Sequence, residues 1–354
     1  MNRLFLARVA LSALLVCAAC VGLQDRARAQ TAPEMEFVYR FQPRDTLIQL
    51  SRRLLLQPGR WPELQTRNRI ANPFNIPPDT PIRIPYSWLK LKPETAQVQT
   101  TSGTVTRGGT AVAAGEQLAE GVVVETGADG SVTLGFADGS TVTLQKASVL
   151  RLEQMQKVDG VADGHSVRLE LESGRAESKV KPKRDVGRFE IATPVAVSAV
   201  RGTQFRVGFS ADSGNATTET TDGTVNVAAP AAAVAVHAGF GTRVEKSGSV
   251  LPPTALLAAP DVSAVPELNT LPALDVRLGA VAGAVSYRVQ IAPDAEFHAI
   301  AADIQTAEPV VSVEKLGEGE QWLRARAIDQ FGLEGADAIR KFSQHLLPSA
   351  PGLA

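Results

Sequence analysis

The chain has 354 residues, which is long for one ordinary domain and favours two to four domains. Hydrophobic residues make up 44% of it and aromatic residues only 5%, a composition that suits many short strands better than large helices. The formal net charge of −1 provides no overall field to attract nucleic acid or an anionic membrane, so we expect no nucleic-acid partner.

Residues 1–29 have the pattern of an export signal. Basic residues such as Arg3 precede an apolar run, and an Ala-x-Ala cleavage motif ends at Ala29. A retained signal anchor is one alternative, and a lipoprotein signal with the lipid on Cys20 is another. The only two cysteines, Cys17 and Cys20, lie in this segment, so cleavage after Ala29 leaves no disulfide and no thiolate. We expect a protein of the periplasm or cell envelope, with membrane contact only if Cys20 is lipidated.

Residues 37–89 are predicted to form a strand, two helices and a second strand. Apolar and polar residues alternate over Phe37–Phe41, which is typical of a strand. Asp45-Thr46 can cap the first helix, because short oxygen-bearing side chains accept hydrogen bonds from free amides at helix starts. Prolines then indicate an extended loop before the final strand at Ile82–Ile84.

This unit resembles a LysM domain, a small βααβ module that binds N-acetylglucosamine-containing glycans such as peptidoglycan. The matching motifs are Tyr39-Arg40-Phe41, Asp45-Thr46-Leu47, Trp61 with Leu64, Asn68-Arg69-Ile70, Asn72-Pro73, Ile76-Pro77-Pro78 and Ile82-Arg83-Ile84-Pro85. Two family glycines are replaced, by Arg44 before Asp-Thr and by Asp79 before the last strand. The resemblance implies a shallow glycan-binding groove formed by Arg44, Asp45, Thr46, Asn72, Pro73, Phe74, Asn75 and Ile76.

Residues 98–246 are predicted to form an all-β domain of roughly a dozen short strands. Its most regular stretch is Glu125–Leu144, where Val132 and Leu134 alternate with polar or small residues. Asp138-Gly139 supplies the positive φ angles of a tight hairpin turn. The turn spacing favours a sandwich or a solenoid.

This region resembles a FecR domain. The landmarks that carry the resemblance are Gly115, Leu118, Gly121, Thr126-Gly127, Asp129-Gly130-Ser131, Ala137-Asp138-Gly139-Ser140, Ser148, Leu150, Leu152, Gly174-Arg175, Ala192-Thr193-Pro194 and Val200-Arg201-Gly202-Thr203-Gln204-Phe205. The family is best known for periplasmic parts of iron-uptake signalling regulators, so the resemblance implies a β-rich fold and an envelope location.

Residues 247–265 are rich in Ala, Pro and Ser and are expected to be a linker. Residues 266–346 follow as a third β-rich domain, in which apolar residues alternate with Arg288 and Gln290 and later with Arg324 and Arg326. The region resembles a fibronectin type III-like β-sandwich through Gly283-Ala284, Tyr287-Arg288-Val289-Gln290, Phe297, Gly319 and Arg324-Ala325-Arg326-Ala327-Ile328-Asp329.

The sequence indicates no catalytic or metal-binding constellation. The four histidines, His165, His237, His298 and His345, show no HxH or HExxH spacing, and no G-x-S-x-G motif is present. We therefore predict a protein that is not an enzyme and that uses no metal and no cofactor.

We predict an exported envelope protein that binds peptidoglycan through the LysM-like unit and offers its β-rich domains to another envelope protein. The alternative is a FecR-type periplasmic signalling component that senses an envelope or outer-membrane partner.

Overall fold

The computed structural model describes residues 36–182 and 187–346. Over these residues the protein is mainly β, with 49% strand and 7% helix, which confirms the predicted fold class at that level. From Phe37 onward the chain forms one compact unit. Among the described residues, no helix has both the length and the apolar character needed to cross a membrane. The predicted export signal lies outside the described part of the chain.

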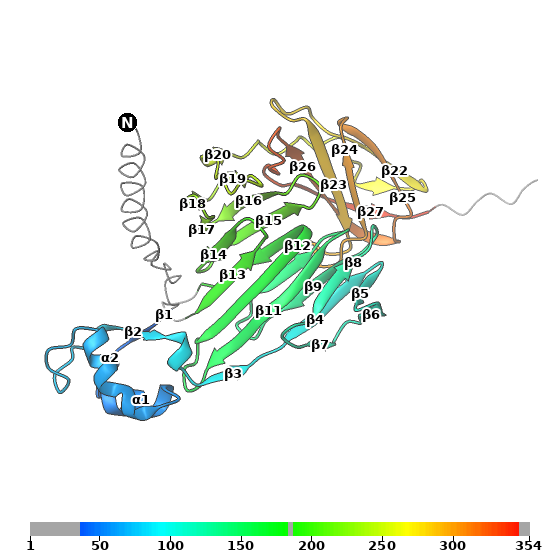
Figure 1. Cartoon of the computed structure of the whole chain (residues 1–354). Coiled ribbons are helices and arrows are strands. Elements are labelled where there is room, and N and C mark those ends of the chain that lie inside the picture. Colours follow the sequence, from blue (N-terminus) through cyan, green and yellow to red (C-terminus); the bar gives the residue numbers. More distant parts are fainter. Residues whose placement is uncertain (1–35, 183–186, 347–354) are drawn as a thin grey trace, which may run out of the picture. The chain divides into compact units, whose positions relative to one another are not determined.

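The N-terminal unit, residues 37–89, contains the predicted order of strand, helix, helix and strand (Figure 1). Its elements are β1 (Glu36–Arg40), α1 (Leu47–Leu54), η1 (Pro58–Arg60), α2 (Trp61–Arg67), β2 (Pro81–Pro85) and η2 (Tyr86–Trp88). Helix α1 begins after Thr46, whose hydroxyl accepts a hydrogen bond from the Gln49 amide at 3.2 Å. The apolar face of α1 packs on both strands, and Val158 from the next domain joins the same core. Assignment of this unit to the LysM class stays a prediction.

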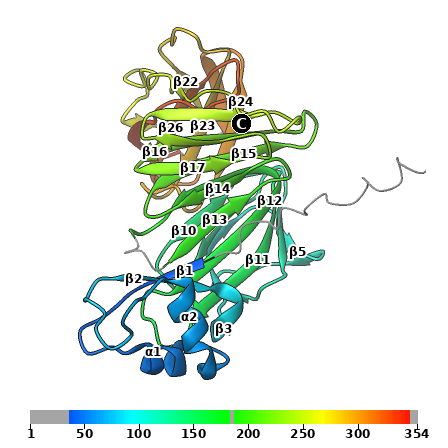
Figure 2. The same cartoon turned by 60° about the vertical axis from the view of Figure 1, so that its left-hand side comes forward.

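The central β-domain consists of strands β3–β20, arranged in two sheets that share β12 and close on one another (Figure 2). The first sheet contains β3 (Leu91–Pro93), β5 (Val105–Arg107), β6 (Thr110–Ala111), β8 (Val123–Thr126), β11 (Val149–Val158), β12 (His165–Lys179), β13 (Arg188–Ala192), β14 (Val197–Val200), β17 (Thr224–Ala228) and β18 (Ala233–His237). The second sheet contains β4 (Ala96–Ser102), β7 (Gln117–Leu118), β9 (Ser131–Gly135), β10 (Thr141–Leu144), the end of β12, β15 (Gln204–Ser210), β16 (Asn215–Asp222), β19 (Phe240–Val244) and β20 (Thr254–Ala255).

The apolar faces of the two sheets meet in a single core. Val132 and Leu134 of the predicted hairpin are fully buried there, opposite Leu150 and Leu169 of the first sheet. The predicted turn is present, because Gly139 has a φ of 77° and its amide donates to the Phe136 carbonyl at 2.8 Å. The two sheets thus enclose one core, and their strands together close into a barrel.

Strand β12 passes from the first sheet to the second at Gly174. Ser173 still pairs with Val149 of the first sheet, whereas Gly174 pairs with Phe209 of the second. The backbone at Gly174 has a φ of 86°, and a Cβ there would lie 2.0 Å from the Ser148 hydroxyl oxygen. Only glycine satisfies both conditions, so the connection between the two sheets depends on it.

The segment 247–265 has more structure than its composition indicates. Its strand β20 pairs with β19, and the Leu251 amide donates to the Arg243 carbonyl at 2.9 Å. Val265 is buried in the core of the C-terminal unit. The segment is held because its backbone groups bond to the edge strand β19, an interaction that composition cannot reveal.

The C-terminal unit contains a five-stranded sheet, in the order β21-β27-β26-β23-β24, and a two-stranded sheet, β22-β25. Its strands are β21 (Leu268–Asn269), β22 (Ala273–Arg277), β23 (Ser286–Ala292), β24 (Ala302–Thr306), β25 (Val310–Glu314), β26 (Gly319–Ile328) and β27 (Ala338–Gln344). Apolar residues from both sheets share one core, as in a β-sandwich. The fibronectin type III-like assignment stays a prediction.

Replacing Gly174 by alanine should destabilise the central β-domain by roughly 2–4 kcal/mol, because the new Cβ meets Ser148 and the left-handed backbone is strained. Gly121→Ala is the matched control, since Gly121 has a φ of 87° but no atom within 4 Å of its Cβ position. Urea unfolding followed by circular dichroism measures both variants. Equal losses in the two would mean that contact with Ser148 is unimportant.

Candidate functional site

In the first predicted glycan-binding loop, Arg44–Thr46, the first residue has the left-handed backbone conformation that glycine usually adopts. Arg44 has a φ of 74°, and Asp79, which replaces the second family glycine, has a φ of 65°. A non-glycine residue adopts this region at a cost of about 1–2 kcal/mol. The two substitutions therefore change the side chains that the unit displays while the left-handed turns remain.

Two of the predicted binding residues have their side chains committed to the loop itself. The Asp45 carboxylate accepts hydrogen bonds from the Tyr39 hydroxyl at 2.6 Å and from the Gln42 amide at 3.0 Å. Burial, and then the hydrogen bond to Asp45, raises the pKa of Tyr39 to about 12, so the phenol stays protonated and keeps donating at neutral pH. Thr46 caps α1 in the same way. These side chains position the loop.

The second predicted loop, Asn72–Ile76, is a turn with an exposed aromatic ring. The Asn72 side-chain oxygen accepts from the Phe74 amide at 3.0 Å, which fixes the turn. Phe74 is 90% exposed, whereas Ile76 packs against the core of the unit. Pro73 is half-buried, and Asn75 is exposed.

The backbone brings the start of the first loop next to the turn that follows the second. The Asp79 amide donates to the Phe41 carbonyl at 2.8 Å, and the Phe41 amide donates to the Thr80 carbonyl at 3.0 Å. The turn that follows the second loop therefore lies beside the residues that precede the first. Of the eight predicted residues, Arg44, Thr46, Asn72, Phe74 and Asn75 are exposed.

A second candidate region, which the sequence analysis did not predict, is a polar face on the second sheet of the central β-domain. Directly paired residues on neighbouring strands share a face. One row of such pairs runs from β4 to β16 and consists of Thr100, Thr133, Thr143, Glu177, Arg206 and Glu219. Although these residues are polar, Thr133 and Glu219 are fully buried and Arg206 is 1% exposed.

The polar face of the C-terminal unit covers this row. On its sheet Arg288 pairs with Arg326, and Gln290 pairs with Arg324, on the side opposite its apolar core. Arg326 donates to Glu177 of β12 at 3.0 Å, and Arg324 donates to the same carboxylate at 3.1 Å. Two sheets therefore meet through charged side chains, which we call the charged interface.

Glu334 lies at the centre of the charged interface. Its carboxylate accepts hydrogen bonds from Arg288 at 2.9 Å and Arg326 at 2.8 Å, both from its own unit. From the central β-domain, Arg175 lies 3.0 Å from it and Arg206 lies 3.8 Å from it. Four guanidinium groups from two domains thus surround one carboxylate that is 1% exposed.

The charges of the interface balance. Its members are five arginines (Arg175, Arg206, Arg288, Arg324 and Arg326) and five acids (Glu177, Glu219, Asp303, Glu334 and Asp337). Burial alone would raise the pKa of Glu334, but the surrounding arginines outweigh it and hold that pKa well below 4.5. The resulting contribution to stability is present above pH 4.5 and is lost as the pH falls towards the lowered folded-state value.

Hydroxyl groups hold the other end of the interface. Thr100 and Thr133 each donate to the His298 carbonyl at 2.7 Å. Ser131 donates to the Ile300 carbonyl at 3.2 Å. Thr133 of the predicted hairpin and Thr100 of β4 therefore bind the C-terminal unit instead of water.

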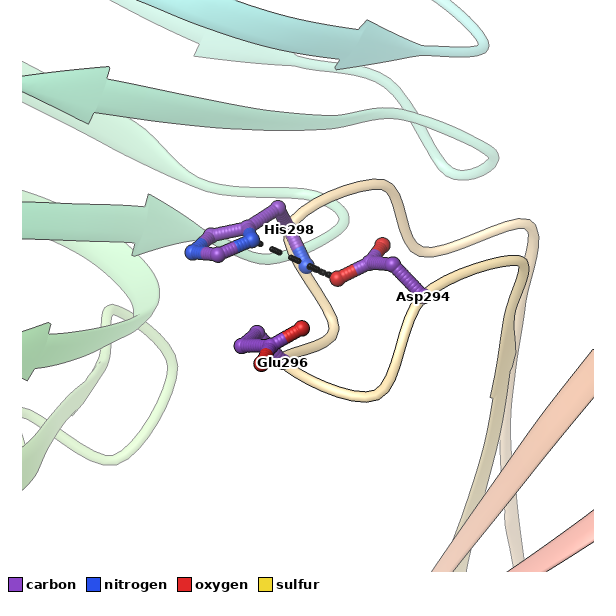
Figure 3. A group of neighbouring side chains, drawn as sticks. All are labelled: Asp294, Glu296 and His298. Atoms are coloured by element: carbon purple, nitrogen blue, oxygen red, sulfur yellow. Dashed lines mark hydrogen bonds and ion pairs between the residues drawn. The ribbon is translucent and has the colours of Figure 1, made fainter.

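Asp294, Glu296 and His298 form a small cluster in the loop that carries these carbonyls (Figure 3). One potential ligand atom from each lies within 4.8 Å of the others, and the Asp-x-Glu-x-His spacing is visible in the sequence. The Asp294 carboxylate already accepts the amides of His298 at 3.0 Å and Ala299 at 3.1 Å. We therefore infer that the Asp294 carboxylate stabilises the conformation of this loop.

Comparison with known families decides the class of the central β-domain. The profile described as FecR protein matches residues 122–226. This part of the chain is a FecR domain. The match falls within the predicted range 98–246 and includes the hairpin and the Val200–Phe205 motif. It also includes β12, β15 and all of β16, so the FecR domain supplies Arg175, Arg206 and Glu219 to the charged interface.

Solved structures show more distant similarity. Two crystal structures of a protein from Parabacteroides distasonis ATCC 8503 classed as an anti-sigma factor align at 19% and 18% identity, each with a TM-score of 0.32. Each alignment covers 38% of this chain and 59% of that protein. A beta-1,2-glucanase from Parabacteroides distasonis aligns at 12% identity and a TM-score of 0.22, over 72% of this chain and 37% of the glucanase. No curated protein matches the chain.

Replacing Glu334 by glutamine should destabilise the protein by roughly 3–5 kcal/mol, because it leaves buried guanidinium groups without their shared carboxylate. The matched control is Glu320→Gln, because Glu320 is 68% exposed and pairs only at the surface with Lys341. Urea unfolding of the full chain gives both free-energy changes. A loss below 1 kcal/mol for Glu334→Gln would show that the interface contributes little to stability.

Proposed function

We propose that this chain is a FecR-type signalling component of the cell envelope. FecR proteins are associated with the envelope, and the FecR domain at residues 122–226 is the observation that carries the proposal. The charged interface supports this proposal, because it joins the FecR domain to the C-terminal unit. Its ion pairs form only when these two parts of the chain are correctly aligned. A partner that binds the C-terminal unit could then act on the FecR domain directly. The protein would act by binding another envelope protein, with no catalytic step of its own.

Deleting the gene in its native host should change the levels of a restricted set of transcripts, and complementation with the full chain should restore them. RNA sequencing measures both effects. An unchanged transcriptome, under conditions where the protein is detected in the envelope, would exclude the signalling role.

A second function, peptidoglycan binding by the N-terminal unit, is favoured by two features. Phe74 is 90% exposed at the loop end where the resemblance places the groove, and such a ring can stack on a sugar. Residues 37–89 also carry eight arginines against three acidic residues, a net charge of +5 in a chain whose total is −1. Carboxylates on the peptide stems of peptidoglycan would be attracted to this unit. Binding there would hold the signalling protein at the cell wall.

Phe74→Ala should weaken sedimentation of the full chain with insoluble peptidoglycan about tenfold, which corresponds to roughly 1.4 kcal/mol. Leu56→Ala is the control, because Leu56 is 63% exposed and lies beyond α1, outside both loops. Raising the salt concentration should also reduce binding, since the unit is strongly basic.

Three outcomes of the sedimentation assay can be told apart. A wild-type chain that stays in the supernatant excludes peptidoglycan binding. Equal binding by the two variants excludes Phe74 from the contact. Binding that is independent of salt excludes the attraction between the arginines and the peptide stems.

A further inference from the structure

A cavity of about 740 Å³ lies beside the charged interface, between the second sheet and the C-terminal unit. Its floor is formed by β12, β15, β16 and β19, and its opposite wall includes Ser286, Arg288 and the turn from Ile328 to Gly332. Cavities at the junction of two domains are common positions for small-molecule sites. We call this space the interface cavity.

A second row of paired residues forms the floor. Arg175 pairs with Gly208, Gly208 with Thr217, and Thr217 with Arg243, so the four side-chain positions share one face. Neighbouring strands are about 4.8 Å apart, which places the backbones of the two arginines about 14 Å apart across the floor. The small residues between them leave room for a ligand.

Polar atoms converge over the middle of this floor. A Cβ on Gly208 would lie 2.8 Å from the Thr217 hydroxyl oxygen and 2.9 Å from Arg175 Nη1. Both groups therefore project over the glycine. Any residue larger than glycine would displace them, so the sequence at 208 keeps the donors in place.

Two polar atoms at the interface cavity, Thr217 Oγ1 and Arg243 Nε, are buried without a hydrogen-bond partner among the described residues. Buried polar atoms in native proteins are nearly always paired, so two such atoms at one cavity indicate a missing partner. Arg175 differs, because its Nε lies 3.0 Å from a Glu334 carboxylate oxygen and its charge is also balanced by Glu219. Arg243 has no acidic group within 4 Å among the described residues, unlike the five arginines of the charged interface.

The chemistry of the lining identifies the class of ligand. A guanidinium group presents parallel N–H donors that match the two oxygens of a carboxylate. Phe209, Ile328 and Phe331 add apolar surface to the same cavity. A ligand that satisfies both would have a carboxylate at one end and an apolar or aromatic body at the other.

We propose that the interface cavity binds a small organic carboxylate, with Arg243 as its principal charged contact and Thr217 as a second hydrogen-bond partner. Because both domains line the cavity, the bound ligand would hold the FecR domain and the C-terminal unit together. This site is separate from the predicted glycan loops, and it stands whether or not the chain has a signalling role.

Isothermal titration of the full chain with benzoate tests the site. Benzoate should bind one to one and raise the unfolding temperature, whereas benzyl alcohol, which has the same ring without the charge, should bind at least tenfold more weakly. Arg243→Gln should weaken benzoate binding roughly tenfold or more, because it removes a charged hydrogen bond. Arg277→Gln is the matched control, since Arg277 is exposed on β22, away from the cavity lining, and it should leave binding unchanged.

A second variant tests whether benzoate binds in the interface cavity, and it leaves Arg243 unchanged. Val285 lines the cavity and is 55% exposed, so Val285→Trp should fold and should block benzoate by filling the space. The proposal is overturned if benzoate does not bind the wild-type chain, if benzyl alcohol binds equally well, or if Val285→Trp binds benzoate as the wild type does. None of these results bears on the transcript measurements, so the two proposals can fail separately.

Discussion

The charged interface is the constraint on which the arrangement of the protein from Phe37 onward depends. Two sheets usually meet through apolar side chains. Here the apolar faces are used inside each domain, and the polar faces meet with Glu334 among four arginines. Removing these charges from water costs several kcal/mol for each ion, and the cost is offset only where each charge meets an opposite one in good geometry. The match of five arginines to five acids satisfies that condition.

An interface of this kind favours one docking arrangement over others more than it adds to stability. A shift of one residue along β26 would replace Arg324 and Arg326 by residues that now face the apolar core of the C-terminal unit. The guanidinium groups would then lose their shared partner on β12, Glu177. Alternative arrangements are penalised by unpaired buried charge, so the FecR domain and the C-terminal unit are held in a single relative position. A protein that passes on a binding event benefits from such a fixed connection.

Much of the local structure could be predicted from the sequence because it depends on short-range rules. The Asp138-Gly139 turn, the cap at Thr46 and the strand that contains Val167 need only neighbouring residues. The FecR landmarks could be recognised for the same reason, since glycine is required where the backbone turns. The long-range pairing of β20 and the burial of Val265 could not be predicted from the sequence, because both depend on surfaces brought together by folding. The predicted glycan residues are displayed as two loops, and their ligand stays a prediction.

The sequence by itself determined which residues share a face. Thr133 alternates with Val132 and Leu134, and Arg324 and Arg326 alternate with Leu323 and Ala325, so each strand has one apolar and one polar side. Such alternation normally indicates a strand with one face in water. Only the tertiary structure decided that these polar faces meet each other, because the pattern is the same whether the polar side contacts solvent or a complementary set of charges. The interface cavity arises from that packing too, where Arg243 finds no acidic partner among the described residues.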